Sequence, residues 1–153
     1  MNRVVYYGQW VAALLIPLFY VVGRVWLGAG GGWLIVLGVV LGPLMALLLL
    51  IPPVLTAMDP ATRAARATGR LYAIWSLVLW GLGFLMVITK SDQADGPKVA
   101  SALSHWTGIS ISASDGLNTV FTIAFWAVWV VILVLAARTL VAGRRSGVSN
   151  AAV

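Results

Sequence analysis

The chain alternates between long apolar runs and shorter polar segments. Four runs, over about residues 4–27, 33–57, 69–89 and 119–140, consist almost wholly of hydrophobic side chains. Each run is long enough to cross a hydrocarbon core of roughly 30 Å as a helix that rises about 1.5 Å per residue. Strands of a membrane barrel would alternate in polarity, and these runs do not. The pattern therefore predicts an all-α polytopic membrane protein, built as a bundle of four transmembrane helices.

The composition agrees with the pattern. Hydrophobic residues make up 61% of the 153 residues and charged residues only 9%, with a mean hydropathy of +1.00. A soluble domain carries about 25% charged residues, so we expect residues 1–153 to form a single membrane domain. The first run exceeds the roughly 7–15 apolar residues of a signal peptide, and we expect it to be retained as a span.

The 58–68 connector carries a helix-start signal. Asp59-Pro60 is typical of an N-cap followed by proline in the first turn. The third helix is therefore expected to begin before the chain re-enters the membrane. Arg63, Arg66 and Arg70 would then share one face of that helix. This face is expected to bind anionic lipid or to dock a cytoplasmic protein partner.

The 90–118 loop is long enough to contain its own structure. Asp95-Gly96-Pro97 and Gly108 indicate the start and the stop of a short amphipathic helix on the membrane surface. Residues 109–112 alternate in polarity and are expected to be extended, and Asp115 is expected to cap the fourth helix.

Basic residues are distributed unevenly between the two sides of the predicted membrane. One side carries seven arginines and one aspartate, and the other carries three basic residues and three aspartates. Because Lys and Arg concentrate in cytoplasmic segments, we predict a cell-membrane protein with both termini and the 58–68 connector in the cytoplasm. The 141–153 tail is then cytoplasmic, and disordered after Arg145. The arginine-rich side carries Arg3, Arg63, Arg66, Arg70, Arg138, Arg144, Arg145 and Asp59. The other side carries Arg24, Lys90, Lys98, Asp92, Asp95 and Asp115.

Small residues form stripes on the second and third runs. Helices in lipid associate through close packing at small residues rather than through a hydrophobic driving force. The stripes are expected to face neighbouring helices of the same chain, with a homodimer seam as the alternative. Pro17 and Pro43 should kink their helices, either as plain structure or as a hinge. The stripes are Gly38, Gly42 and Ala46, and Gly69, Ala73, Ser76 and Gly83.

Residues that carry chemistry are scarce. The chain has no cysteine and no glutamate, its single histidine is His105, and no acid lies inside a run. Catalysis and metal binding usually need such groups at defined spacing. We therefore expect no enzyme activity, no metal and no cofactor. No basic run is dense enough to predict nucleic-acid binding.

Three tryptophans and one arginine are candidates for binding. Trp80, Trp126 and Trp129 lie inside the runs, and an indole N–H buried there needs a partner, such as Ser76 or carbonyl groups beside Pro17 and Pro43. Structural packing and a pocket for a lipid-like or aromatic ligand both remain open. Arg24 either reaches the outer surface or faces inward and binds an anion. Gln9 is expected to be hydrated near the inner interface.

These features favour a non-catalytic integral membrane protein that acts through protein or lipid partners, as an accessory or assembly subunit. The alternative is a small oligomeric channel or transporter for an anion or a lipid-like ligand, which would use Arg24 and the intramembrane tryptophans. Four helices from one chain rarely enclose a pore, so the alternative requires a homo-oligomer.

Overall fold

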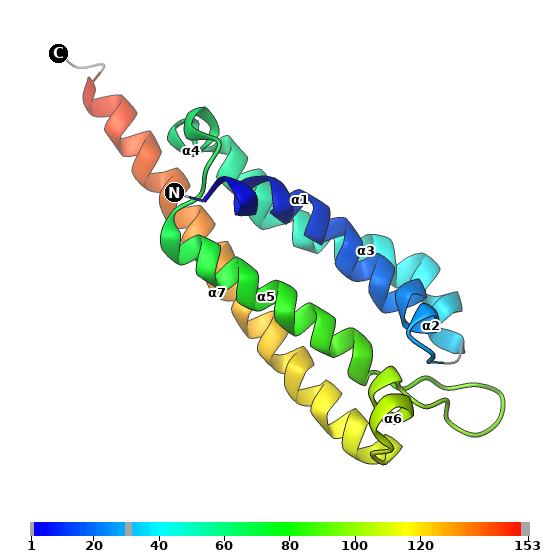
Figure 1. The fold of residues 1–153 in the computed structure, drawn as a ribbon. Helices are drawn as coiled ribbons and strands as arrows, with labels where there is room; N and C mark the ends of the chain where they lie inside the picture. Colours follow the sequence, from blue (N-terminus) through cyan, green and yellow to red (C-terminus); the bar gives the residue numbers. More distant parts are fainter. Residues whose placement is uncertain (1, 30–31, 151–153) are drawn as a thin grey trace.

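The structure, a computed structural model, describes residues 2–29 and 32–150, except for the side chains of Arg24 and residues 144–150. The regular elements of the described chain are all helices, joined by turns and by a loop before α6 (Figure 1), and four segments are long and apolar enough to cross a membrane. The predicted all-α class and its four apolar helices are therefore confirmed, as expected for a multi-pass membrane protein. The segments are Arg3–Gly23, Trp33–Met58, Arg70–Thr89 and Ile111–Gly143.

The first span changes its helical geometry along its length. Pro17 lies in α1 and has no backbone N–H to give to the preceding turn. The chain then winds as a π-helix, a wider turn that often follows such a disturbance. The elements in order are α1 (Arg3–Leu18), η1 (Phe19–Gly23), α2 (Arg24–Trp26), α3 (Trp33–Met58), α4 (Pro60–Ala65), α5 (Arg70–Thr89), α6 (Ala102–Thr107) and α7 (Ile111–Asn150).

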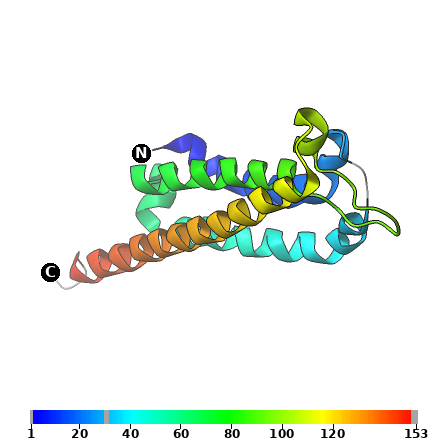
Figure 2. The ribbon, with the colours of Figure 1, turned by 90° about the horizontal axis from the view of Figure 1, so that it is seen from below.

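The four long helices lie side by side, with α1 and α3 as one antiparallel pair and α5 and α7 as the other (Figure 1). The pairs meet because α1 packs on α5 and α3 packs on α7. One end of the molecule holds the start of α1, the helix α4 and the end of α7. The other end holds α2, α6 and the loop before α6. Figure 2 shows α7 projecting beyond the other helices at the first end.

The core lies where the two pairs meet. Its most deeply buried side chains come from α1 and α7, with Val5 and Phe125 fully buried and Ile132 nearly so. Leu79 and Met86 of α5 belong to the same buried cluster. Many other apolar side chains of these helices face outward, which suits a protein surrounded by lipid.

The connector between α3 and α5 differs from the prediction. Asp59 does cap a helix that has Pro60 in its first turn, and its carboxylate accepts a 2.9 Å hydrogen bond from the Thr62 N–H. That helix, α4, ends at Ala65, because Arg66 adopts a left-handed conformation with φ of 47°. The expectation that the third helix begins here was wrong, since α5 begins only at Arg70.

The 90–101 loop also differs from the prediction. A helix start at Asp95-Gly96-Pro97 was wrong, because Asp92 and Val99 pair as an isolated β-bridge and the chain reverses between them. The helix α6 instead begins after Ser101, whose hydroxyl accepts a 3.0 Å hydrogen bond from the Ser104 N–H. It ends at Gly108, as predicted, in a left-handed conformation.

The fourth long helix is longer at both ends than the sequence indicated. It begins at Ile111, so the extended conformation expected for residues 109–112 was wrong for its last two residues. Ser110 rather than Asp115 serves this helix start, since its hydroxyl accepts a 3.2 Å hydrogen bond from the Ala113 N–H. At the other end, the helical backbone continues to Asn150, so the disorder expected after Arg145 was wrong for residues 146–150. Residues 151–153 of that tail lie outside the described residues.

Candidate functional site

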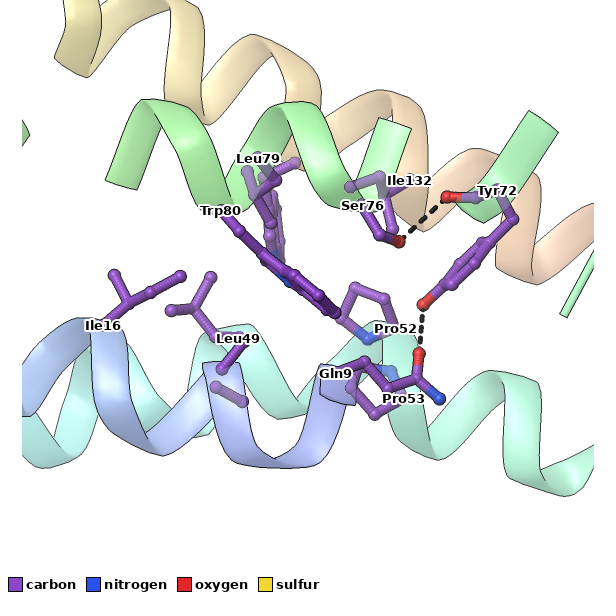
Figure 3. Close-up of a pocket in the computed structure, with 13 residues that line it drawn as sticks. Gln9, Ile16, Leu49, Pro52, Pro53, Tyr72, Ser76, Leu79, Trp80 and Ile132 are labelled. Carbon is purple, nitrogen blue, oxygen red and sulfur yellow. Dashed lines mark hydrogen bonds between the residues drawn. The ribbon is translucent and has the colours of Figure 1, made fainter. Parts of the chain in front are cut away.

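A buried polar junction joins α1, α3 and α5 (Figure 3). Gln9 is only 4% exposed, and its Oε1 accepts a 2.7 Å hydrogen bond from the Tyr72 hydroxyl. Its Nε2 donates to the Tyr6 carbonyl oxygen and to Thr56 Oγ1, both at 3.1 Å. Ser76 donates a 2.9 Å hydrogen bond to the Tyr72 carbonyl oxygen. The expectation that Gln9 is hydrated was wrong, because neighbouring helices supply its partners.

Carbonyl oxygens at or near the prolines of α3 accept further hydrogen bonds in this region. Pro52 lacks the N–H that would bond to the Leu48 carbonyl oxygen four residues earlier. The indole N–H of Trp129 on α7 donates to that oxygen at 3.2 Å. The Thr56 hydroxyl likewise donates to the Pro53 carbonyl oxygen at 2.8 Å. An indole partner beside a proline was predicted, but at Pro17 or Pro43 rather than at Pro52.

The three candidate tryptophans do not form one pocket. Trp80 and Trp129 border a small cavity of about 20 Å³ beside Gln9 (Figure 3), which is room for about one water molecule. Trp126 borders a different and larger cavity. Its ring meets that of Trp129 edge to face, with centroids 5.7 Å apart.

The larger cavity has a volume of about 260 Å³ and lies among α1, η1, α3, α5 and α7. Its wall is mostly apolar, with polar groups only from Tyr20, Thr122 and Trp126. A groove of about 400 Å³ runs along α1, η1 and α3 beside it. The two spaces share four lining residues, which are Pro17, Val21, Gly38 and Gly42.

The predicted small-residue stripes mostly lie against neighbouring helices. A Cβ at Gly38 would come within 2.2 Å of a Val21 methyl carbon, and one at Gly83 within 3.2 Å of Ile16. Ala73 and Ser76 are buried, and Ala46 borders the groove. Gly69 differs, since nothing lies within 4 Å of its Cβ position, and it precedes α5 as the N-cap.

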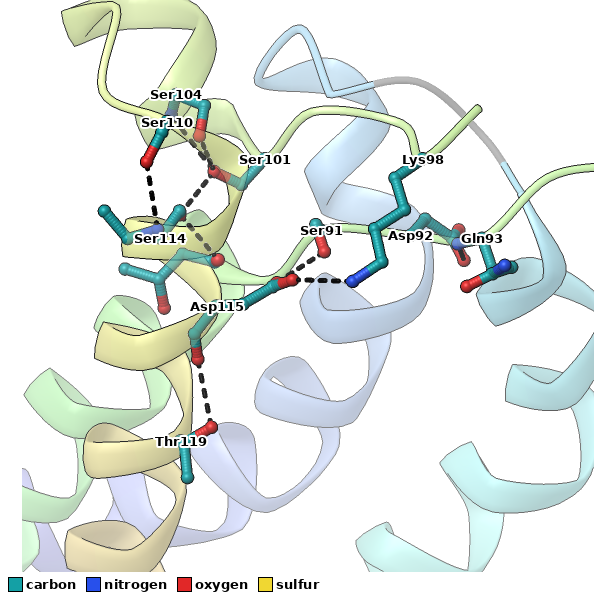
Figure 4. Close-up of polar contacts among 12 residues, drawn as sticks. Ser91, Asp92, Gln93, Lys98, Ser101, Ser104, Ser110, Ser114, Asp115 and Thr119 are labelled. Carbon is teal, nitrogen blue, oxygen red and sulfur yellow. Dashed lines mark hydrogen bonds and ion pairs between the residues drawn. The ribbon is translucent and has the colours of Figure 1, made fainter. Parts of the chain in front are cut away.

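A second polar cluster closes the opposite end of the helix pairs (Figure 4). Asp115 accepts a short hydrogen bond from the Ser91 hydroxyl, and its other oxygen pairs with Lys98 Nζ at 3.2 Å. The carboxylate expected to cap α7 thus connects that helix to the loop before α6. Lys98 is mostly exposed, so this ion pair adds little stability by itself.

The end of α5 obtains its caps from α7. The last carbonyl groups of a helix have no partner within the helix. The Ser114 hydroxyl donates a 2.8 Å hydrogen bond to the Thr89 carbonyl oxygen, and Asn118 Nδ2 donates to that of Met86 at 2.8 Å. Ser114 also bonds to Ser101 at 2.6 Å, which brings α6 into the same network.

The start of α3 obtains its caps from the 90–101 loop. Its own N-cap, Gly32, offers no side chain. The buried Asp92 carboxylate instead accepts from the Leu34 N–H at 3.1 Å, and the Gln93 carbonyl oxygen accepts from the Trp33 N–H at 2.8 Å. A carboxylate at a helix N-terminus is also favoured by the helix dipole. This contact was missed because residues about 60 positions apart provide it.

A polar cleft of about 270 Å³ opens between this loop and the ends of α3 and α7. Lys90, Lys98, Asp92 and Asp115 all border it, so its formal charges balance. Both carboxylates are held by contacts within the protein. The Lys90 ammonium forms no hydrogen bond or close ion pair with any described side chain, and it acts on Asp115 only through longer-range attraction. The other lining residues are Trp33, Leu34, Leu37, Ser91, Gln93, Asn118 and Thr119.

The arginine candidates lie apart from both cavities. Arg63, Arg66 and Arg70 are exposed at the end that holds α4. The expectation that they share one face of a single helix was wrong, because the chain turns at Arg66. The side chain of Arg24 lies outside the described residues, so its inward or outward direction stays a prediction.

The described side chains include no group of three His, Cys, Asp or Glu residues that could hold a metal ion. His105 is exposed, and its ring lies beside the Cβ position of Gly28. The polar side chains of the two clusters described above join helix ends and helix faces to one another. Comparison with known proteins finds no family model, no curated protein and no solved structure that matches this chain.

Proposed function

We propose that this chain is a non-catalytic integral membrane protein that acts through partners, as an accessory or assembly subunit of a membrane complex. The observation that carries the proposal is the use of the polar side chains. Gln9, Ser114, Asn118 and Asp92 each complete a contact between helices or at a helix end. A catalytic site would need such groups to converge on a space where a substrate can bind.

The surface of α3 supports a role in association. This helix is the most apolar of the four, and only 11% of its most apolar window is buried within the chain. Val39 and Val40 are about three quarters exposed. In lipid, such an exposed apolar face can pack against another membrane helix through van der Waals contacts. The proposed protein partner binds along this face.

The proposed orientation places both termini and α4 in the cytoplasm of a cell-membrane protein. The antiparallel helices collect the seven arginine positions at one end of the molecule and leave balanced charges at the other. Positive residues favour the cytoplasmic side. Arg63, Arg66 and Arg70 then face anionic lipid or a cytoplasmic partner, although not as one helical face.

A small oligomeric transporter for a lipid-like ligand is a second candidate. The cavity of about 260 Å³ favours it, because it lies inside the membrane-spanning part beside the π-helical turn η1. Its apolar wall suits a lipid chain better than an ion. This candidate requires several copies of the chain.

The test is photo-crosslinking in the native membrane, followed by mass spectrometry. A benzophenone side chain is placed at Val39 or Val40 on α3, and at Ile123 on α7 as a matched exposed control. The proposal expects one recurrent protein adduct from α3 that is absent from Ile123. Purification of the chain as a monomer, with lipid adducts only, would overturn the accessory function. Adducts between copies of the chain, together with ligand flux, would favour the transporter.

A further inference from the structure

We infer that the larger cavity and the polar cleft together bind one anionic phospholipid of the bilayer, with an acyl chain in the cavity and the head group at Lys90. This inference deepens the proposed function and rests on the part of it that gives the chain lipid partners. It assigns one site to one class of lipid.

The two spaces lie end to end. Leu34 borders both the cavity and the cleft. On α7, Asn118 of the cleft is followed one turn later by Thr122 of the cavity, and on α3 Leu37 of the cleft is followed by Leu41. The combined site therefore passes from polar to apolar along one line, as a phospholipid does.

The cavity has the length of an acyl chain. Its lining on α3 extends from Leu34 to Leu48, which corresponds to about 20 Å of helix. The wall over this length is apolar except for two hydroxyl groups and one indole. Lipid chains surround this part of the protein, and the groove beside the cavity gives them a route to it.

Gly42 on α3 lies where the groove meets the cavity, whereas the Val21 side chain fills the space beside Gly38. Gly38 and Gly42 border both spaces, so no side chain of theirs stands between them. A Cβ at Gly42 would lie 3.6 Å from Val21, which is an ordinary contact. A larger side chain there would occupy the space that the acyl chain needs, with little strain on the backbone.

The cleft selects an anionic head group. Asp92 and Asp115 are already held by helix α3 and by Ser91 and Lys98. Lys90 is half-buried and has no close counter-ion among the described side chains. A phosphate oxygen of the head group can accept charge-assisted hydrogen bonds from the Lys90 ammonium, and a lipid with net negative charge brings no cation of its own to compete for that phosphate.

The experiment is native mass spectrometry of the full chain, purified in mild detergent and incubated with phosphatidylglycerol or with phosphatidylcholine of the same acyl chains. We expect one tightly retained phosphatidylglycerol per chain. Gly42→Leu should lower its occupancy at least about tenfold, because the leucine fills the acyl-chain space. Lys90→Gln should weaken binding about fivefold, the usual contribution of one lysine to an anionic lipid. The Lys90→Gln substitution lies in the cleft and leaves the side chains that line the cavity unchanged.

Matched controls separate binding from folding. Gly81→Leu makes the same change on α5, where nothing lies within 4 Å of the Cβ position. Arg3→Gln removes an exposed charge at the start of α1, at the end of the molecule opposite the cleft. Both should bind like the parent. Equal retention of the two lipids, or full occupancy in Gly42→Leu, would overturn the inference. If the photo-crosslinking experiment finds no protein partner while phosphatidylglycerol is still retained, only the accessory function is contradicted.

Discussion

Proline and tryptophan act as a pair in this protein. Pro52 leaves the Leu48 carbonyl oxygen without its helical donor, and Trp129 of another helix provides one. In lipid, a backbone acceptor without a partner is costly, because no water replaces the lost bond. A defect in the hydrogen bonding of α3 is thereby converted into a contact between α3 and α7.

Replacement of Trp129 tests this pairing. Trp129→Phe should lower the free energy of unfolding by about 1 kcal/mol, because the hydrogen bond to Leu48 is lost. Pro52→Ala restores a backbone N–H for that oxygen, so Trp129→Phe should cost less in the Pro52→Ala background. The measurement is reversible unfolding in mixed micelles. Trp126→Phe is the control, and an equal cost for both tryptophans would contradict the assignment.

The Gln9 junction is a second case in which one residue joins several helices. A double-mutant cycle of Gln9→Leu and Tyr72→Phe should give a coupling of about 0.6 kcal/mol and at most about 1.7 kcal/mol, the range of hydrogen bonds between membrane helices. The same unfolding assay measures it. Additive effects of the two substitutions would mean that the Tyr72 hydroxyl and Gln9 do not interact in the folded protein.

At the scale of elements, the start of α3 and the end of α5 are completed by other segments of the chain. Asp92 and Gln93 cap α3, while Ser114 and Asn118 cap α5. Each contact joins segments that are distant in sequence. These two helix ends therefore obtain their hydrogen-bond partners only when the helices are packed together.

Gly32 shows how closely the loop and α3 approach. A Cβ at this position would lie 2.5 Å from the Gln93 carbonyl oxygen and 2.7 Å from the Asp92 carboxyl carbon. Gly32→Ala should therefore destabilise the protein by about 1–3 kcal/mol. Gly96→Ala, in the same loop but with open space around its Cβ position, should have little effect. Thermal unfolding in detergent measures both, and similar melting temperatures for the two variants would contradict this account.

The sequence predicted the elements better than their limits. Run length and polarity depend on each segment alone, so the four long helices could be predicted. The role of Asp115 could not, because Ser91 and Lys98 hold its carboxylate through tertiary contacts. The predicted starts of α6 and α7, at Asp95 and Asp115, were wrong because the local caps are Ser101 and Ser110. Trp80, Trp126 and Trp129 do lie within the candidate membrane spans, as predicted. Their division between two cavities depends on how α7 packs, which no local pattern contains.

At the scale of the whole molecule, the distribution of charge gives a topology that can be tested. Single cysteines at Ser110, beside α6, and at Ser146, near the end of α7, should lie on opposite sides of the membrane. We expect an impermeant maleimide to label Ser110→Cys from outside intact cells and to leave Ser146→Cys unlabelled until the cells are opened. Labelling in the reverse pattern would invert the proposed orientation. Labelling of both from outside intact cells would contradict the single crossing by α7 that separates them.

The length of α7 has a mechanical consequence. Its 40 residues form a helix about 60 Å long, about twice the thickness of the hydrocarbon core. The surplus projects at the end that holds both termini (Figure 2). A domain attached directly after Asn150 would therefore stand on a stiff stalk, not on a flexible tether. Its distance from the membrane would be set by the rise of the helix, and its orientation would follow any rotation of α7 within the membrane.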